Sequence, residues 1–90
     1  MERFKLVRFE KAKAKNKKYS AILEDVKTKK TKRVNFGDDR YEQYEDSTGL
    51  GLYSHKDHKD EKRRAAYKSR HAKTAAVKWS ASYFSNRYLW

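Results

Sequence analysis

The fold is decided by residues 19–36, which read YSAILEDVKTKKTKRVNF. The first half of this stretch alternates as a β-strand does, with Tyr19, Ala21 and Leu23 on one face and Ile22 on the other. Apolar side chains on both faces indicate a strand that is at least partly covered on both sides.

A second strand returns across a lysine-rich turn. Residues 27–30 (KTKK) are polar and form the turn, and Val34 and Phe36 then share one face of a strand over residues 31–36. Gly37, followed by two aspartates, ends this strand. The sequence therefore predicts a β-hairpin with a basic tip.

The chain before this hairpin contains few large apolar residues. Residues 4–9 alternate and predict a short edge strand, whereas residues 11–18 (KAKAKNKK) carry no apolar side chain larger than alanine. Because nothing anchors this run to a core, we expect a mobile basic arm. We therefore divide the chain into a basic arm with a short edge strand, residues 1–18, and a single small α+β domain, residues 19–90.

The chain after the hairpin is first acidic and then helical. Residues 38–53 are rich in acid and tyrosine, with Tyr41 and Tyr44 spaced for one helical turn. Asp57 or Asp60 then caps a helix that continues to about residue 73, and residues 75–89 predict a second helix. The predicted fold class is α+β, with a small antiparallel β-hairpin or sheet in the N-terminal half, an acidic loop and two C-terminal helices.

Charge is the strongest signal in the composition. The 24 Lys and Arg exceed the 12 Asp and Glu, which gives a formal net charge of +12. Residues 1–34 hold thirteen basic and four acidic side chains, residues 35–61 hold three and eight, and residues 62–90 hold eight and none. Such a distribution is typical of proteins with a polyanionic partner. The alternative is that the excess of lysine serves only to keep the protein soluble.

Other features exclude several classes of protein. The chain has no cysteine, which excludes disulfides, thiolate metal sites and cysteine nucleophiles. Its apolar runs are far too short to span a bilayer, and its N-terminus lacks a signal-peptide core. We expect a protein that is not secreted, that has no membrane partner and that acts inside a cell or a particle.

Basic residues are interleaved with aromatic ones in the C-terminal third, a composition that suits phosphate contacts and base stacking. Six basic residues crowd the first predicted helix, and others occupy the basic arm and the hairpin tip. The predicted nucleic-acid-binding residues are Lys11, Lys13, Lys15, Lys17, Lys18, Lys29, Lys30, Lys62, Arg63, Arg64, Lys68, Arg70, Lys73, Lys78 and Arg87.

The aromatic residues of this region have a second interpretation. A chain with so few Leu, Ile and Val must build its interior from rings, so we expect Trp79, Phe84 and Trp90 to lie in the core. Charge contacts to the phosphate backbone are then the main mode of binding.

Residues 53–71 (YSHKDHKDEKRRAAYKSRH) contain all three histidines. Two histidines and a carboxylate can bind zinc, and His with Asp can act in acid–base catalysis. The residues begin in a predicted loop, however, and so short a chain leaves little room for a catalytic pocket. We predict a structural clasp that fixes the acidic loop to the basic helix, and no catalytic residue, cofactor or metal ligand. Its members are His55, Asp57, His58, Asp60 and His71.

Several motifs follow one another in a fixed order. They are Lys17-Lys18-Tyr19, Val34-x-Phe36-Gly37, Tyr41-x-x-Tyr44, Tyr53-Ser54-His55-x-Asp57-His58-x-Asp60, Arg63-Arg64-x-x-Tyr67-x-x-Arg70-His71 and Phe84-Ser85-x-x-Tyr88-Leu89-Trp90. Over residues 8–90 the chain resembles an uncharacterised family, a domain of unknown function, of small basic proteins encoded by giant and large algal DNA viruses. The resemblance implies a viral origin and a place in the virion, or in the viral factory or nucleus of the host, but no activity.

Two functions remain open at this point. The first is binding of nucleic acid, DNA rather than RNA, by a virion- or genome-associated protein that contacts the phosphate backbone. The second is that of a minor capsid or virion structural protein wedged between larger subunits, with other virion proteins as its partners. Order in solution distinguishes the two, because a wedge protein is expected to fold only on its partner.

Overall fold

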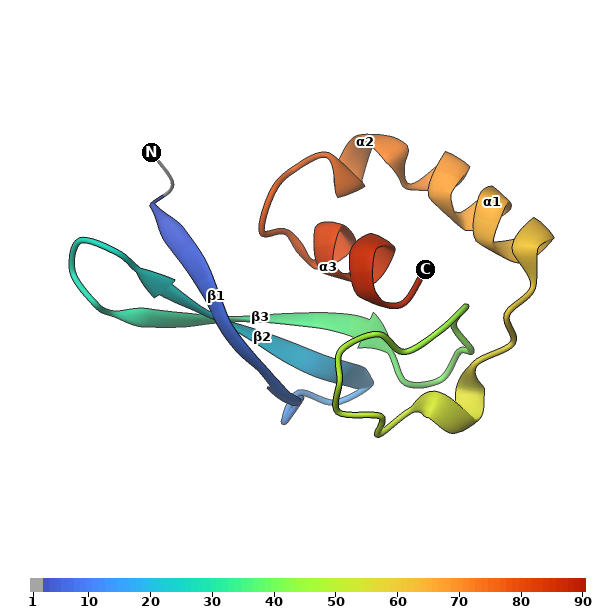
Figure 1. The fold of residues 1–90 in the computed structure, drawn as a ribbon, viewed down its shortest axis with the longest axis horizontal. Coiled ribbons are helices and arrows are strands. Elements are labelled where there is room, and N and C mark those ends of the chain that lie inside the picture. The colour runs from blue at the N-terminus through green and yellow to red at the C-terminus, as the bar shows by residue number, and fades with distance from the viewer. Residues whose placement is uncertain (1–2) are drawn as a thin grey trace.

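The computed structural model describes residues 3–90, which form a three-stranded antiparallel sheet with helices on one side of it (Figure 1). The strands are β1 (Phe4–Lys11), β2 (Lys17–Asp25) and β3 (Thr31–Asp38), in the order β1-β2-β3. The helices are a short 3₁₀ helix η1 (Ser54–Lys56), α1 (Glu61–Arg70), α2 (Ala72–Ala75) and α3 (Ala81–Tyr88). The predicted α+β class is confirmed.

The hairpin of β2 and β3 has the register that its alternation predicts. Tyr19 lies opposite Phe36, and Ala21 lies opposite Val34. Tyr19, Ala21, Leu23 and Phe36 are fully buried, and Ile22 on the other face is also buried. The prediction of a strand covered on both faces is confirmed.

Strand β1 is an integral part of the sheet. A β-bulge shifts its register between Leu6 and Arg8, so that Leu6 lies opposite Leu23 and Phe9 lies opposite Ala21. The bulge therefore brings two apolar residues that are three apart in sequence onto the same core-facing side, where both pack against the core.

The mobile basic arm expected over residues 11–18 needs correction. This run is the end of β1, a short turn and the start of β2, and the expected domain boundary at residue 18 falls inside a strand. Main-chain pairing holds the run in place, because Ala12 N donates to Lys18 O at 3.1 Å. Backbone pairing needs no apolar anchor, which is why side-chain composition misjudged this segment.

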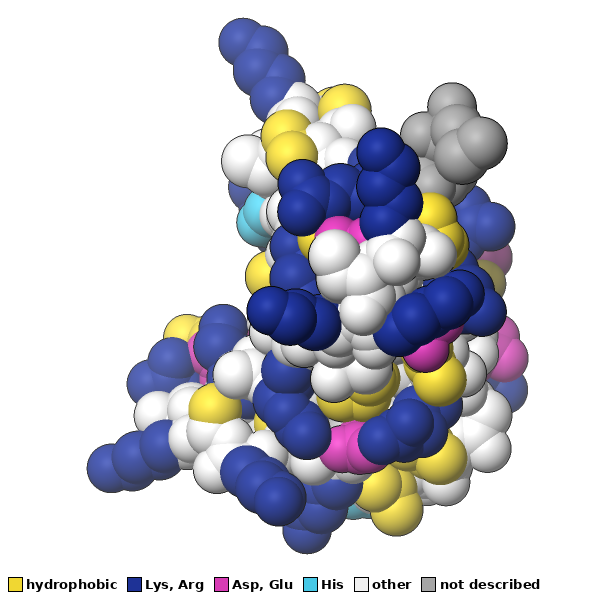
Figure 2. Space-filling view, turned by 90° about the vertical axis from the view of Figure 1, so that its left-hand side faces the viewer, with side chains coloured by type: hydrophobic (Ala, Val, Ile, Leu, Met, Phe, Trp, Pro, Cys, Tyr) yellow, Lys and Arg dark blue, Asp and Glu magenta, His cyan; other side chains and the backbone are white. Residues whose placement is uncertain are grey.

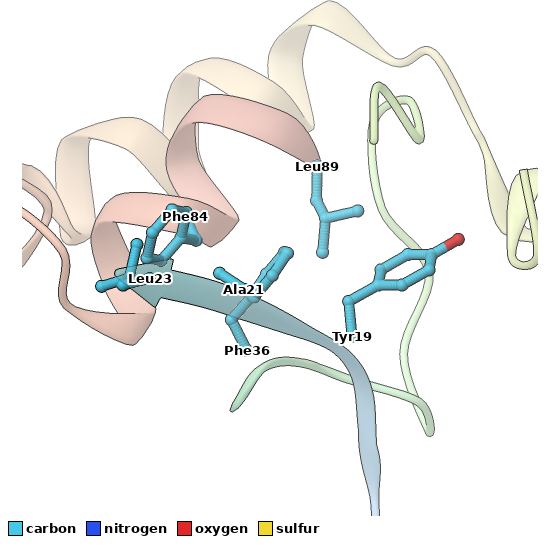
Figure 3. Packing of buried hydrophobic residues seen from close by; sticks show 6 residues of the cluster. All are labelled: Tyr19, Ala21, Leu23, Phe36, Phe84 and Leu89. Carbon is cyan, nitrogen blue, oxygen red and sulfur yellow. The ribbon is translucent and has the colours of Figure 1, made fainter. Parts of the chain in front are cut away.

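Helix α3 closes the core over the sheet. Phe84 and Leu89 are buried against Tyr19 and Phe36 (Figure 3). The ring of Phe84 lies 5.5 Å from that of Phe36. Rings thus form most of the interior, as predicted: Phe84 lies in the core, and Trp79 and Trp90 are partly buried against it.

Helices α1 and α3 each begin directly after an N-cap residue, Asp60 and Ser80. The Asp60 carboxylate caps α1 by accepting from the Lys62 and Arg63 amides at 3.0 and 3.2 Å. The second predicted helix begins at Ala81 and not at residue 75, because Trp79 has a left-handed φ of 69° and Ser80 provides a new N-cap. Helices α1 and α2 lie beyond α3, on its side away from the sheet (Figure 1).

Residues 39–53 form an irregular loop, without the helical turn expected at Tyr41 and Tyr44. Gly37, in β3 two residues before this loop, has a φ of +76°. A Cβ at this position would lie 2.8 Å from Leu89 Cδ1, so glycine allows the end of α3 to approach the sheet.

Candidate nucleic-acid interface

The turn between β2 and β3 forms one end of the molecule and carries four exposed lysines (Figure 2). These are Lys27, Lys29, Lys30 and Lys32. None of the four forms an ion pair within residues 3–90. Lys29 and Lys30 were predicted. Lys27 and Lys32 were missed, although Lys27 lies in the same predicted turn and Lys32 lies two residues after it.

The Asp25 carboxylate holds this turn in shape from inside. Its Oδ1 accepts from the amides of Lys27 and Thr28 at 2.9 and 3.2 Å, and its Oδ2 accepts from Arg3 Nε at 2.9 Å. The Arg3 hydrogen bond, followed by the amide bonds, lowers the pKa of Asp25. Because the charge of Asp25 is offset by its ion pair with Arg3, it forms no ion pair with the lysine side chains of the turn.

The other turn, between β1 and β2, has a weaker positive field. Lys11, Lys13, Lys15 and Lys17 are exposed there, as expected for phosphate contacts. Lys17, however, pairs in register with Asp38, and the turn contacts the acidic loop through its backbone. Asp38 pairs with Arg40, but Asp39 forms no ion pair within residues 3–90, so an unpaired acid lies beside this group of lysines, whereas Glu24 and Asp25 near the β2–β3 turn are both paired.

The predicted basic residues of the helical region separate into two sets. Exposed positions are occupied by Lys62, Arg63, Arg70, Lys73, Lys78 and Arg87. Arg63 donates to exposed Glu42 at 3.0 Å, and Lys78 and Arg87 lie against the rings of Trp79 and Tyr88. Within residues 3–90, Arg70 has no hydrogen bond or ion pair.

Arg64 and Lys68 form the second set and serve the fold itself. Arg64 Nε donates to the Trp90 main-chain oxygen at 2.8 Å, and its guanidinium lies over the ring of Tyr44. Lys68 Nζ donates to Asn86 O at 3.3 Å. Both side chains point inward from α1 and hold the C-terminal segment, so they are poor candidates for phosphate contacts.

Lys18 was predicted to bind nucleic acid, and this prediction is wrong. Its side chain is buried, and its ammonium donates to Gln43 Oε1. Desolvation, together with the nearby Lys56, lowers its pKa to about 8. A buried ammonium that is bonded inside the fold is not available to a phosphate.

A buried polar network that sequence reasoning missed surrounds Lys18. Fully buried Gln43 donates from Nε2 to Tyr53 O at 2.7 Å and to the Asp57 carboxylate, which also accepts from the Asp46 amide at 2.9 Å. Nearby, the Tyr19 hydroxyl donates to the Asp46 carboxylate. Burial and this hydrogen bond raise the pKa of Tyr19 to about 12. No sequence period marks a glutamine in an acidic loop as a core residue.

The five residues of the predicted clasp occupy several places. Asp57 joins the Gln43 network, and His58 Nδ1 accepts from the Asp60 amide at 2.9 Å. His55 is exposed beside Tyr53, and His71 lies at the far end of α1, stacked on Tyr67. The five therefore do not form one cluster. The contact between the loop and the η1–α1 junction is made largely by Gln43 and Asp57.

Residues 3–90 contain no candidate metal-binding group and no candidate membrane-spanning helix. Within residues 3–90, no group of three His, Asp or Glu side chains is placed to hold a metal ion. No helix in the same range is long and apolar enough to cross a membrane.

Comparison with known proteins gives one match. The model of a family of unknown function (DUF5754) matches residues 7–47, which cover most of the sheet and the start of the acidic loop. No curated protein and no solved structure matches the chain. The match agrees with the expected resemblance to a family without assigned function, while the viral origin stays a prediction.

Proposed function

We propose that this protein binds nucleic acid without sequence preference, through phosphate contacts made by the end of the molecule that carries the β2–β3 turn. One observation carries the proposal. Four exposed lysines surround this turn, while Glu24 and Asp25, the two acids at the end of β2, already pair with Lys5 and Arg3 at 3.3 and 2.9 Å. Unneutralised positive charge at one place is the feature that a polyphosphate backbone recognises.

The shape of this end favours duplex DNA over duplex RNA. The major groove of B-form DNA is about 12 Å wide and admits a two-stranded β-ribbon, so we expect the β2–β3 turn, the part of the hairpin that extends past the pairing of Phe4 in β1 with Asp25, to approach it. The major groove of A-form RNA is too narrow for side chains to read. The lysines around the β2–β3 turn would then lie against the phosphates that border the groove. Lysine binds phosphate as a point charge, so contacts of this kind carry little base specificity.

The resemblance to small basic proteins of giant and algal DNA viruses adds a biological setting to this proposal. In that setting the ligand is the viral genome, and the protein is packaged with it or accompanies it in the host. The alternative, a minor virion structural protein, uses the same basic end against acidic protein surfaces.

A salt titration of duplex DNA binding tests the proposal. Each neutralised phosphate contributes about −0.9 to the slope of log affinity against log salt, so four contacts predict a slope of roughly −4. Fluorescence anisotropy of a labelled duplex at several salt concentrations measures it, with a duplex of unrelated sequence as the control. Equal affinity for both duplexes is expected. Failure to bind at low salt would contradict nucleic-acid binding and favour the virion structural role.

A further inference from the structure

A pocket of about 570 Å³ lies between α1, the end of β3 and the C-terminal residues. Gly37 and Asp38, which line it, are at the end of β3 opposite to the β2–β3 turn, and Figure 1 shows these two ends of the strand. Ligand pockets commonly measure about 300–1,000 Å³, so this one has room for a single nucleotide. Tyr41, Arg63, Tyr67, Arg70 and Trp90 are among the residues that line it.

A preformed stack of rings makes one wall of this pocket. The rings of Tyr67 and Trp90 are nearly parallel, with centroids 4.3 Å apart and an angle of 6° between them. His71, which also lines the pocket, stacks on Tyr67 at 4.1 Å. Arg64 fixes the Trp90 main chain, so the wall is in place without a ligand.

Tyr41 reaches the same pocket from the loop that follows β3. Its side chain is one of the most exposed large hydrophobic groups of the described chain, at 66%. Arg40 lies near this ring, 5.9 Å from its centroid. An exposed tyrosine beside a ring-lined pocket is well placed to stack on a planar base.

The charges around the pocket favour an anion. The Asp38 carboxylate is already bonded to Arg40 at 2.7 and 3.0 Å. Arg63 pairs with Glu42, but both side chains are about half exposed, and such surface pairs are weak and exchange readily. Arg70 has no hydrogen bond or ion pair within residues 3–90. Two guanidinium groups, one of them unengaged, are thus available to a phosphate.

We infer that this pocket takes one unpaired nucleotide, with its base against Tyr41 and its phosphate on Arg70 and Arg63. The inference rests on the proposed function, since the nucleotide belongs to a nucleic acid held by the basic end of the molecule. It adds a preference that phosphate contacts alone do not give, because a base can enter the pocket only when it is unpaired. Single strands, loops and frayed ends offer such bases, whereas an intact duplex does not.

Anisotropy with a labelled single strand and with a duplex of equal length tests the inference in wild type and variants. Tyr41→Ala and Arg70→Ala should each weaken single-strand binding by about fivefold or more, and duplex binding by less than about twofold. Lys73→Ala is the matched control for charge, because Lys73 is exposed and does not line the pocket. It should change both affinities alike. Equal losses for both ligands in the pocket variants would overturn the inference.

A second arm of the experiment distinguishes a failure of this inference from a failure of the proposed function. Adenosine 5′-monophosphate, titrated alone, should quench tryptophan fluorescence through Trp90, and Tyr41→Ala should abolish this quenching. If the wild type binds neither DNA ligand, the proposed function fails, and this arm alone decides whether the pocket takes a nucleotide. No quenching of the wild type would contradict the pocket. Thermal melts of each variant should match the wild type, since Tyr41 and Arg70 are exposed.

Discussion

At the scale of single residues, Lys17 and Lys18 are neighbours with opposite environments. Lys17 is exposed, whereas Lys18 is buried in the polar network of Gln43, Asp46 and Asp57. Adjacent residues of a strand point to opposite faces, so one position decides whether an ammonium meets solvent or the interior. A run of lysines in a sequence does not by itself reveal this difference.

The buried ammonium makes stability depend on pH. The pKa of Lys18 falls from its ordinary 10.5 to about 8 in the folded state. Below about pH 8 the Lys18 side chain carries its proton in both the folded and the unfolded state, so the cost of desolvating the ammonium lowers the free energy of unfolding in full. Between the two values the folded state loses its proton first, so the free energy of unfolding should rise with pH, by about 3 kcal/mol at most. The effect of Tyr19 is opposite and comes later, because its pKa is raised from 10.0 to about 12.

Urea unfolding across this pH range measures the rise. Lys18→Met should abolish it, whatever that substitution does to the absolute stability. Lys17→Met, the matched control at an exposed position, should keep it. A rise of equal size in Lys18→Met would show that the buried ammonium is not its source.

Gln43 supports a second prediction at this scale. Its side chain is fully buried and joins Lys18, Tyr53 and Asp57. Gln43→Ala removes the hydrogen-bond acceptor of the buried Lys18 ammonium and one of the hydrogen bonds to Tyr53 O and to the Asp57 carboxylate, so it should lower the free energy of unfolding by about 1–3 kcal/mol. Chemical denaturation measures this loss, with Glu42→Ala, at the exposed neighbouring position, as the control expected to stay near wild type. An unchanged midpoint for Gln43→Ala would argue against the network.

At the scale of elements, substitutions in β1 test whether the N-terminal segment contributes to the core. Phe9 packs against Phe36, Phe84 and Tyr88, with ring centroids 4.7 to 6.2 Å apart. Phe9→Ala should therefore destabilise the protein by about 2–4 kcal/mol. Val7 lies at the bulge of the same strand and is 45% exposed, so Val7→Ala should cost less than about 0.5 kcal/mol. Similar midpoints for the two variants in urea would mean that β1 is dispensable.

Elements stabilised by local patterns were predictable from the sequence. The alternation of residues 19–36 predicted the hairpin, and Asp60, one of the two caps predicted for the first helix, lies directly before α1. The start of α3 was not predictable, because tryptophan rarely has a left-handed backbone conformation and its residue type gives no sign of the one that Trp79 adopts. Gln43 limited the prediction of the candidate site, because its partners are ten or more residues away and are brought together only by the fold.

At the scale of the whole molecule, exposed lysine charge is concentrated at one end of an elongated body, 41 Å in its longest dimension. The β2–β3 turn carries lysine at one end, and the acidic loop lies beyond the other end of the same hairpin (Figure 1). A polyanion orients such a molecule, because it attracts the lysines of the β2–β3 turn more strongly than the acidic loop, whose charge is offset in part by basic residues of α1 such as Arg63 on Glu42. Orientation of this kind places the lysines of the turn first against the phosphates.

The most direct test compares two double variants with the same loss of charge. Lys27→Gln with Lys30→Gln removes two charges from the β2–β3 turn, and Lys56→Gln with Lys59→Gln removes two from the acidic region. The measurement is the salt dependence of duplex DNA binding for both variants and the wild type. If the turn contacts phosphates, the first variant should lose about 1.8 from the magnitude of the log–log slope, and the second should keep the wild-type slope. Equal slopes for the two variants would contradict binding through the β2–β3 turn.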